Sequence, residues 1–522
     1  MISTKRSLQF AGAVIAAALM LSGCAASEEP EDTGSTTSSG DPVSGGTLRA
    51  IELAQPTGFD PVQIFSSTSM PITFSALYGQ FVIANPETGG YDCGLCESFT
   101  TSDEGATWDI VLPEGQTFTD GTPVDAEAIK YNWERIKDPA NGSASAGIAS
   151  QIASIEVVDD YTVKLNMAVP TPGFIGLMPI YSLQWIASPT ALEQGQEAFN
   201  KNPVGAGPYK VESWTQGGTV KLVRNEDYFG EPGYLDAIET QGVTDDAQRL
   251  NALIAGQADL ILNSAPTQFV EAEAAGFTNI KYVYNGGVGF MLNTGKAPFD
   301  DVRARQALSY ALDLDALSNA VNRGNGAVPT TLFQSDSPFF SDIPLQSYDP
   351  DKAQELFDEL ADEGKPLEFT FTVFPGTGQT IFDALQAQLT EYDNVTVTAD
   401  QRDASEQGVV TTNGDYNVAQ SSLAFVDAAS RLWGALDSSA ERTNYSRISD
   451  PRLDEALDAA IAATDIAEQK EHFAEVQELL AELQPYILFQ EYYNGAIVSD
   501  KVNGVFMYGY TTPAAAGIWL EQ

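Results

Sequence analysis

Two short runs of alternating apolar and polar residues stand out in the first third of the chain. Residues 108–112 and 163–167 place apolar side chains at every second position, and this period predicts strands with one buried face. Asp159-Asp160 separates the second run from the apolar stretch Ile155 to Val158. We therefore expect a β-hairpin around these two aspartates.

Helices are predicted where a capping residue precedes apolar residues spaced three or four positions apart. Asp349-Pro350 and Asp450-Pro451 each place an N-cap before a proline in the first turn. Asp300-Asp301 opens a further predicted helix with the apolar positions Val302, Leu308, Leu312 and Leu317. Because strand and helix patterns are mixed over the whole length, the chain is expected to form an α/β or α+β body.

Glycines mark two more element boundaries. Gly205 and Gly207, followed by Pro208, indicate a chain reversal in which positive φ at the glycines is expected. Arg249 to Gly256 is predicted as a helix with a glycine stop, and Asp259 then leads back into a strand.

The first residues have the composition of an export signal. Lys5 and Arg6 precede an apolar run from residue 8 to residue 21, which is too short for a membrane-spanning helix with proper flanks. Residues 27–46 follow, with Val43 as their only large apolar residue. Such a stretch buries too little surface to offset its ordering entropy, so we expect a disordered tether.

The apolar run ends in Leu21-Ser22-Gly23-Cys24, which resembles the bacterial lipobox. That resemblance implies a signal peptide over 1–23, a tether over 24–45, and Cys24 carrying a diacylglyceryl thioether. Two acyl chains give a stable anchor where one gives marginal binding, so the protein would be lipid-anchored on the extracytoplasmic face of the cell membrane. The alternative is a secreted protein in which Cys24 lies beside a cleavage site by chance.

Composition and charge exclude several classes of function. A hydrophobic share of 43% with 10% aromatic residues indicates a globular body with a large core. The formal net charge of −46 argues against nucleic acid, which needs a basic face. It also argues against a body lying flat on an anionic lipid surface.

Cysteine and histidine are scarce, which limits metal and redox chemistry. In an exported protein, Cys93 and Cys96 are most simply a small disulfide. A thioredoxin-like redox pair shares the spacing, but such a pair is expected at the start of a helix. His472 is the only histidine, so no metal site and no cofactor are expected. Neither a phosphate-binding P-loop nor a Gly-x-Ser-x-Gly elbow occurs, and we expect no enzyme.

Five segments then occur in a fixed order along the chain: Phe118–Val124, Asn202–Phe229, Arg249–Leu260, Asn293–Asp313 and Tyr348–Ala353. In this order and spacing they resemble the family 5 extracellular solute-binding proteins, the peptide-, dipeptide- and nickel-type receptors of ABC importers. The resemblance extends from about residue 46 to the C-terminus.

This resemblance implies an α/β, two-lobe periplasmic-binding-protein-like fold with an inserted subdomain and a hinge. The first lobe would comprise 46–80, 204–280 and 488–522, the inserted subdomain 81–203, and the second lobe 281–487. A monomeric receptor of this kind would bury its ligand between the lobes and deliver it to ABC permease subunits.

The family also indicates where the ligand would bind. In peptide-binding members, an acidic residue in a loop of the second lobe pairs with the ligand ammonium, and Asp427 lies at the matching position. Ala428 follows it where the family often has proline. The structural alternative for Asp427 is an N-cap of a helix over Ala428–Leu436.

Four neighbouring side chains complete the candidate site. Phe425, Trp433 and Tyr493 are candidate apolar walls, with core packing as the alternative for each. Arg431 is a candidate partner for a ligand carboxylate, with a place on a helix surface as the alternative.

The expected cargo is a short peptide. Nickel is disfavoured because it would need imidazole ligands or an organic chelator. An oligosaccharide, stacked on some of the six tryptophans and 20 tyrosines, remains an alternative. A secreted lipoprotein hydrolase and a non-transporting peptide sensor also remain open.

Overall fold

The computed structural model describes residues 41–521 except 65, 66, 69, 86–89, 104, 404–405, 441–442, 464 and 509–511. The predicted signal peptide, Cys24 and the tether up to residue 40 lie outside the described residues. Near the start of the described residues, the N–H of Gly45 donates to the carbonyl of Tyr234 at 2.8 Å. Within the described ranges, no helix is both long and apolar enough to cross a membrane.

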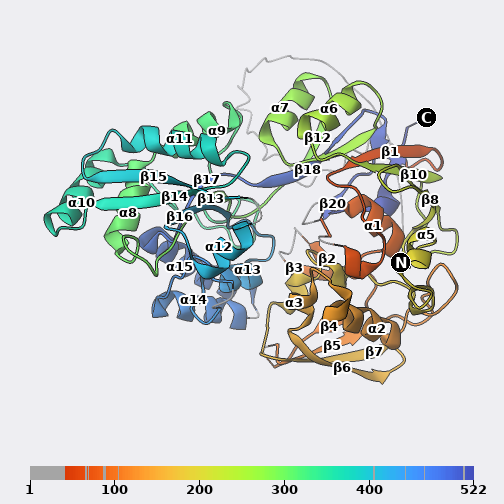
Figure 1. Ribbon diagram of the computed structural model, residues 1–522. Coiled ribbons are helices and arrows are strands. Elements are labelled where there is room, and N and C mark those ends of the chain that lie inside the picture. The colour runs from red at the N-terminus through yellow and green to blue at the C-terminus, as the bar shows by residue number, and fades with distance from the viewer. Residues whose placement is uncertain are drawn as a thin grey trace, which may run out of the picture. The chain divides into compact units, whose positions relative to one another are not determined.

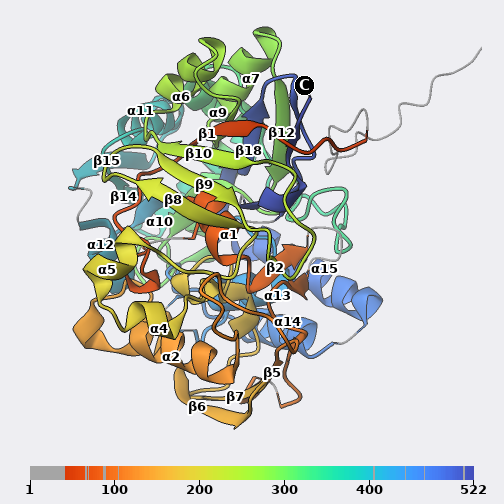
Figure 2. The same ribbon diagram turned by 90° about the vertical axis from the view of Figure 1, so that its right-hand side faces the viewer.

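A seven-stranded sheet of order β12-β18-β11-β1-β10-β9-β8 forms the first large element. Figures 1 and 2 show its strands beside α1, α6 and α7. Strand β1 runs parallel to both β10 and β11, and the other neighbours are antiparallel. The elements are β1 (Thr47–Glu52), β8 (Tyr209–Trp214), β9 (Val220–Arg224), β10 (Ala237–Gly242), β11 (Leu260–Asn263), β12 (Thr278–Val283), β18 (Tyr493–Val498), α1 (Pro71–Tyr78), α6 (Asp246–Ile254) and α7 (Pro266–Ala274).

Each face of this sheet has its own core, because successive side chains of a strand point to opposite faces. Ile261 of β11 and Ile497 of β18 pack with Phe269 of α7. Their neighbours Leu260 and Val498 belong to the larger core on the other face. Strands buried on both faces explain the continuous apolar runs of this region.

The predicted positive φ at Gly205 and Gly207 is wrong, because neither glycine adopts it. A close backbone approach requires them instead. A Cβ on Gly205 would lie 2.2 Å from the carbonyl oxygen of Leu77, and a Cβ on Gly207 2.3 Å from that of Ala76. The two glycines therefore let this reversal pack directly on the backbone of α1.

Residues between β1 and β8 contain a separate antiparallel sheet of order β4-β5-β7-β6. The predicted hairpin is confirmed, since β6 pairs with β7 across Asp159. The elements are η1 (Pro61–Gln63), β2 (Val82–Asn85), β3 (Gly90–Cys93), β4 (Ser98–Thr100), β5 (Thr107–Val111), α2 (Ala126–Lys137), η2 (Pro139–Asn141), α3 (Ala146–Ala149), β6 (Ile152–Asp159), β7 (Thr162–Met167), η3 (Phe174–Leu177), η4 (Ser182–Gln184), α4 (Pro189–Leu192) and α5 (Gln196–Lys201).

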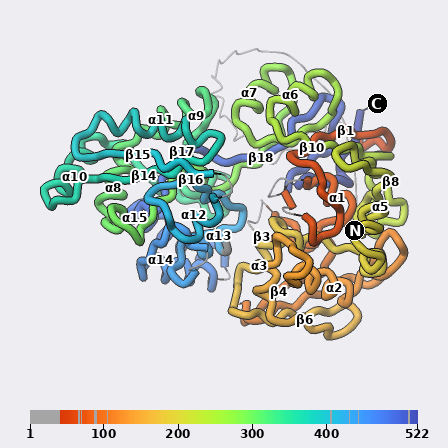
Figure 3. Tube along the Cα trace, in the orientation of Figure 1, coloured from red at the N-terminus to blue at the C-terminus, as the bar shows by residue number. Residues whose placement is uncertain are grey.

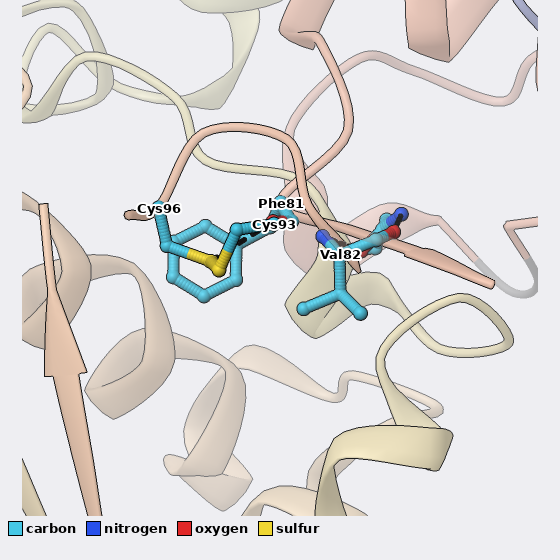
Figure 4. The surroundings of a disulfide bond; sticks show 5 residues. Phe81, Val82, Cys93 and Cys96 are labelled. Atoms are coloured by element: carbon cyan, nitrogen blue, oxygen red, sulfur yellow. Dashed lines mark hydrogen bonds between the residues drawn. A yellow bond between two sulfur atoms is a disulfide. The ribbon is translucent and has the colours of Figure 1, made fainter. Parts of the chain in front are cut away.

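Cys93 and Cys96 are joined by a disulfide with their Cα atoms 5.0 Å apart. Figure 4 shows the two sulfur atoms beside Phe81 and Val82. Cys93 ends β3, where it pairs with Val82 of β2, and β4 follows Cys96 after one residue. The pair therefore fastens one strand end to the next loop, which is not the strand-to-helix setting of a thioredoxin-like motif.

A five-stranded sheet of order β15-β14-β16-β13-β17 forms the second large element. Phe290 and Phe371 face α8 to α11 on one side, while Met291 and Leu488 face α13 to α15 on the other. The elements are β13 (Val288–Leu292), β14 (Leu367–Val373), β15 (Val395–Gln401), β16 (Val418–Ser422), β17 (Tyr486–Gln490), α8 (Val302–Ala311), α9 (Leu314–Asn322), α10 (Pro350–Asp362), α11 (Gly378–Leu389), α12 (Gln407–Asn413), α13 (Ala428–Leu436), α14 (Pro451–Ala462) and α15 (Ile466–Leu483).

The predicted helix starts at Asp349 and Asp450 are confirmed, because their side chains cap α10 and α14. A single helix from Val302 to Leu317 is wrong. Helix α8 ends at Ala311, and the side chain of Asp313 accepts from the N–H of Ala316 to cap a new helix, α9. The apolar spacing continues across the break between α8 and α9, so this spacing alone does not indicate the cap at Asp313.

The chain passes between the two large sheets at two places, which Figure 3 traces. One connection joins β12 to β13 through residues 284–287, and the other joins β17 to β18 through residues 491–492. Strand β17 ends at Gln490, three residues beyond the predicted limit of the second lobe. The C-terminal residues return to the first sheet's part of the molecule and form β19 (Val502–Asn503), β20 (Met507–Tyr508), β21 (Thr512–Pro513), η7 (Ala515–Gly517) and β22 (Trp519–Leu520).

Candidate functional site

The two connections between the sheets lie side by side. The N–H of Tyr284 donates to the carbonyl of Tyr492 at 2.9 Å, and the rings of these tyrosines lie 5.1 Å apart. Tyr282, at the end of β12, meets the Tyr284 ring edge-on at 4.9 Å. Asn494 donates its side-chain N–H to the hydroxyls of Tyr284 and Tyr492 at 3.3 and 3.4 Å. Four residues of two sequence-distant segments thus form one aromatic and polar contact.

This contact extends to other parts of the chain. Tyr284 is buried in one cluster with Ala84 of β2 and Val426 of the loop before α13, and Tyr91 of β3 packs against it. Residues from the first sheet, the 81–203 region and the second sheet's loops therefore meet here. We call this place the lobe junction, defined by Ala84, Tyr91, Tyr282, Tyr284, Val426 and Tyr492.

The loop that carries Val426 is attached to the first connection by backbone pairing. Asn285 and Phe425 exchange N–H to carbonyl hydrogen bonds of 3.1 and 3.0 Å. Gly286 has a φ of +71°, and a Cβ there would lie 2.0 Å from the carbonyl oxygen of Leu423. This close approach requires a glycine, and it fixes the path of the chain up to Asp427.

Asp427 lies directly before α13, and its residue is 8% exposed. The helix over Ala428–Leu436 that the structural alternative for Asp427 named is present. The N–H of Arg431 donates to the carbonyl of Asp427 at 3.4 Å, so these two residues are one helical turn apart. A carboxylate that is largely withdrawn from water beside the lobe junction is a suitable partner for a buried ammonium group.

Arg431 is half-buried and donates through Nη2 to the carbonyl of Ser422 at 2.7 Å. Burial raises the pKa of Tyr181, and nearby Tyr445 raises it further, while the charge of Arg431 lowers it. Tyr181 precedes η4 in the 81–203 region. The positive charge of Arg431 therefore lies near Tyr181, a residue of the 81–203 region.

Three predicted wall residues lie elsewhere. Phe425 has no exposed surface, and its ring meets Phe333 at 5.5 Å in the core of the second sheet. Trp433 donates its indole N–H to Asp458 of α14 at 3.0 Å. A ligand would reach the Phe425 ring only if its packing partners moved, whereas Trp433 is half-buried.

Tyr493 points to the face of β18 that carries α7, where its ring lies 5.4 Å from Phe269. Burial raises its pKa to about 12. The neighbouring positions Tyr492 and Asn494 reach the lobe junction instead. Tyr493 and Asn494 are adjacent in the strand, so their side chains lie on opposite faces of β18. Tyr493 therefore points away from the lobe junction.

Sequence reasoning missed Tyr284, Tyr492 and Asn494. A signal was present, since Tyr-Asn-Gly occurs at both 284–286 and 493–495. Both copies lie beside predicted lobe boundaries, where the chain crosses between lobes.

Glu491 is a titratable group within the second connection. Its backbone N–H donates to the carbonyl of Ala327 at 2.7 Å. Burial raises the pKa of its carboxyl group, while a hydrogen bond from Gln334 and the charge of Lys281 act in the opposite direction.

A surface hollow of about 760 Å³ lies away from the junction, between the start of α8, the end of α10 and the start of β14. All its lining residues belong to the second sheet's part of the chain, so it is not the inter-lobe site that the family resemblance implies. Among the described residues, no group of three or more histidine, cysteine, aspartate or glutamate side chains is placed to hold a metal ion.

Comparison with known proteins identifies the family. The sequence model of the "Bacterial extracellular solute-binding proteins, family 5 Middle" matches residues 91–441. The chain belongs to this family of solute-binding proteins. The glutathione-binding protein GsiB of Shigella flexneri serotype 5b is 30% identical to it over 416 residues, which cover 75% of this chain and 79% of GsiB. GsiB of Salmonella paratyphi A is 30% identical over 412 residues, with the same coverage.

Solved structures place the family 5 protein in a known fold. The oligopeptide-binding protein AppA of Bacillus subtilis, in complex with a nonapeptide, has a TM-score of 0.69 at 20% identity, and the match covers 92% of this chain and 100% of AppA. HbpA2 of Haemophilus parasuis has a TM-score of 0.77 at 21% identity, covering 91% and 100%. The predicted α/β two-lobe fold is confirmed by these matches. The two large sheets are the centres of the two lobes.

Proposed function

We propose that this family 5 protein is a lipid-anchored extracytoplasmic receptor that captures a short peptide between its lobes and delivers it to an ABC import permease. The observation that carries the proposal is the placement of the largely buried Asp427 beside the lobe junction. The relatives support it, since they include proteins named for binding glutathione and one bound to a nonapeptide. Closure of the lobes would depend on a ligand with higher affinity for the closed state.

The role of Asp427 in this function is tested by calorimetric titration with short peptides. Asp427→Asn is expected to weaken binding of free-amine peptides about 10- to 100-fold, because a hydrogen bond to a charged group contributes about 1.5 to 3 kcal/mol. N-acetylated peptides should bind weakly to both proteins and show no difference. Asp300→Asn, at an exposed position of the second lobe, is the matched control. Equal affinity of wild type and Asp427→Asn for free-amine peptides would leave Asp427 only the helix-capping role.

The lipid anchor is tested at Cys24. A Cys24→Ala variant lacks the thiol that would accept the diacylglyceryl group, so it should leave the membrane fraction and partition into the aqueous phase of a detergent extraction. Ser27→Ala, three residues further along, should remain in the membrane and detergent fractions. A Cys24→Ala protein that still partitions with detergent would contradict the anchor.

A further inference from the structure

A segment of the second lobe, residues 327–334, is hydrogen-bonded to both connections between the lobes. The N–H of Gly286, in the first connection, donates to the carbonyl of Leu332 at 2.7 Å. The N–H of Glu491, in the second connection, donates to the carbonyl of Ala327 at 2.7 Å. We call residues 327–334 the strap, because this one segment holds the two connections.

The strap is fixed to the second lobe. Leu332 and Phe333 are at most 1% exposed and belong to the core between the second sheet and α13 to α15. The N–H of Leu332 donates to the side-chain oxygen of Gln477 of α15 at 2.9 Å. Gln477 has no exposed surface, and its side-chain N–H groups donate to the carbonyls of Ser341 and Ile343. The bonds from the strap therefore attach both connections to the second lobe.

Strand pairing attaches the same connections to the first lobe on their other side. Val283, the last residue of β12, pairs with Tyr493, the first residue of β18. The N–H of Tyr284 donates to the carbonyl of Tyr492 at 2.9 Å, which extends this pairing by one residue. The chain up to Tyr284, and again from Tyr492 onwards, is thus held together with the first sheet.

One peptide unit in each connection lies between these two sets of bonds. In the first connection it joins Tyr284 to Asn285, and Asn285 is already paired with Phe425 of the second lobe. In the second connection it joins Glu491 to Tyr492. A hinge motion is absorbed by a few residues that change their φ and ψ angles. These two peptide units are therefore where the chain can bend when the lobes move.

Gln334, the last residue of the strap, bridges the first of these units. Its backbone N–H donates to the side-chain oxygen of Asn285 at 2.8 Å, and its side-chain amide donates to the carbonyl of Tyr284 at 3.3 Å. That carbonyl belongs to the Tyr284–Asn285 peptide unit, so its direction changes when the unit rotates. Burial raises the pKa of the Glu491 carboxyl group, and the same Gln334 side chain acts to lower it. Gln334 thus lies beside both connections.

We infer that Gln334 is a positioning residue for the movement of the lobes, which bend at the Tyr284–Asn285 and Glu491–Tyr492 peptide units. Its side-chain amide holds the first unit in the orientation found here. An arrangement of the lobes in which the Tyr284 carbonyl turns away loses this hydrogen bond. The inference rests on the proposed function only in that a receptor of this kind closes its lobes around a ligand.

The distance between two spin labels, one in each lobe, tests this inference. Val158→Cys in β6 and Ile466→Cys in α15 place the labels at positions that are 55% and 50% exposed. A Cys24→Ala background leaves only the two cysteines of the disulfide. One core joins the 81–203 region to the first sheet, so the label at residue 158 reports on the first lobe. Pulsed electron–electron double resonance then gives the distribution of distances without any ligand.

Gln334→Met keeps the length of the side chain and removes its hydrogen-bonding groups. The ratio of molecules at the main wild-type distance to those at other distances should fall about fivefold, as for the loss of one hydrogen bond. The matched control is Gln346→Met. Gln346 is also a half-buried glutamine of the second lobe, but its amide group bonds to the N–H and carbonyl of Leu488. This control should keep the wild-type distribution, although it also loses hydrogen bonds.

An unchanged distribution in Gln334→Met would overturn the inference. Equal changes in Gln334→Met and Gln346→Met would overturn it as well, because the effect would then come from a general loss of packing in the second lobe. The distances are measured without a ligand. Failure of every peptide titration would therefore contradict the receptor function, while a selective effect of Gln334→Met would still support this inference.

Discussion

Replacing Asp60 by alanine is expected to lower the free energy of unfolding by about 3 to 5 kcal/mol. The Asp60 side chain is 1% exposed and pairs with Arg135 of α2. The two side chains form a bidentate contact, with Nη1 to Oδ1 at 2.9 Å and Nη2 to Oδ2 at 2.7 Å. Burial acts against the charge of Arg135, but the hydrogen bond and charge of Asp60 outweigh it and raise the pKa of the guanidinium. Without Asp60 a partly buried charge would have no partner.

The same change would also weaken the link between η1 and α2, because Asp60 caps η1 by accepting from the N–H of Val62. Urea titration followed by circular dichroism measures the effect. The control is Glu197→Ala, which breaks the exposed pair of Glu197 with Lys201 and should not change stability measurably. Indistinguishable unfolding curves for the two variants would refute the structural role assigned to Asp60.

Glu52 is expected to make the stability of the first lobe fall as the pH rises. Its side chain ends β1 without exposed surface and accepts from the N–H groups of Ile72 and Thr73 at 2.7 and 3.2 Å and from the Thr73 hydroxyl. Burial outweighs these donors and raises its pKa to about 7 from 4.5. Between these values the folded state holds a proton that the unfolded state has lost. The stability that the protonated Glu52 contributes is fully present below pH 4.5. It is therefore lost as the pH rises to about 7, where Glu52 ionises in the folded state.

The predicted size of this effect is about 3 kcal/mol, since one pKa unit corresponds to about 1.4 kcal/mol. Glu52→Gln removes the titration and can keep the contacts, because its amide group can donate to the Thr73 hydroxyl. Urea titrations at pH 5 and pH 8 measure the free energy of unfolding of both proteins. The value for Glu52→Gln minus the value for the wild type should be about 2 to 3 kcal/mol larger at pH 8 than at pH 5. The exposed Glu114→Gln should show no such gain. A difference between Glu52→Gln and wild type that is the same at both pH values would mean that Glu52 is already ionised at pH 5.

Local signals predicted the helix starts because the interactions that create them are local. Asp349 and Asp450 each cap a helix through backbone groups within three residues. The same kind of cap at Asp313 was overlooked, because the apolar spacing continued through it. The signal at Asp313 is equally local, since its side chain accepts from the N–H of Ala316.

The lobe junction could be predicted only in part. Asp427 was proposed from the family resemblance and Arg431 from its place in the same segment, and their ligand roles stay predictions. The helix that begins directly after Asp427 was named in the sequence as the structural alternative for that residue. Which face of β18 meets Tyr284 depends on the pairing of that strand with β11 and β12, and such a register is set by residues far away in sequence. The approach of Tyr181 to Arg431 likewise depends on the packing of two regions that share no local pattern.

Native mass spectrometry of gently purified mature protein tests the receptor function most directly. The account predicts a fraction of the protein that carries one bound short peptide, and the released peptide should be taken up again by stripped protein and recovered with unchanged mass. Rebinding should be weaker for the Asp427→Asn variant. Recovery of a cleaved peptide, or of a sugar together with failed peptide titrations, would contradict the account.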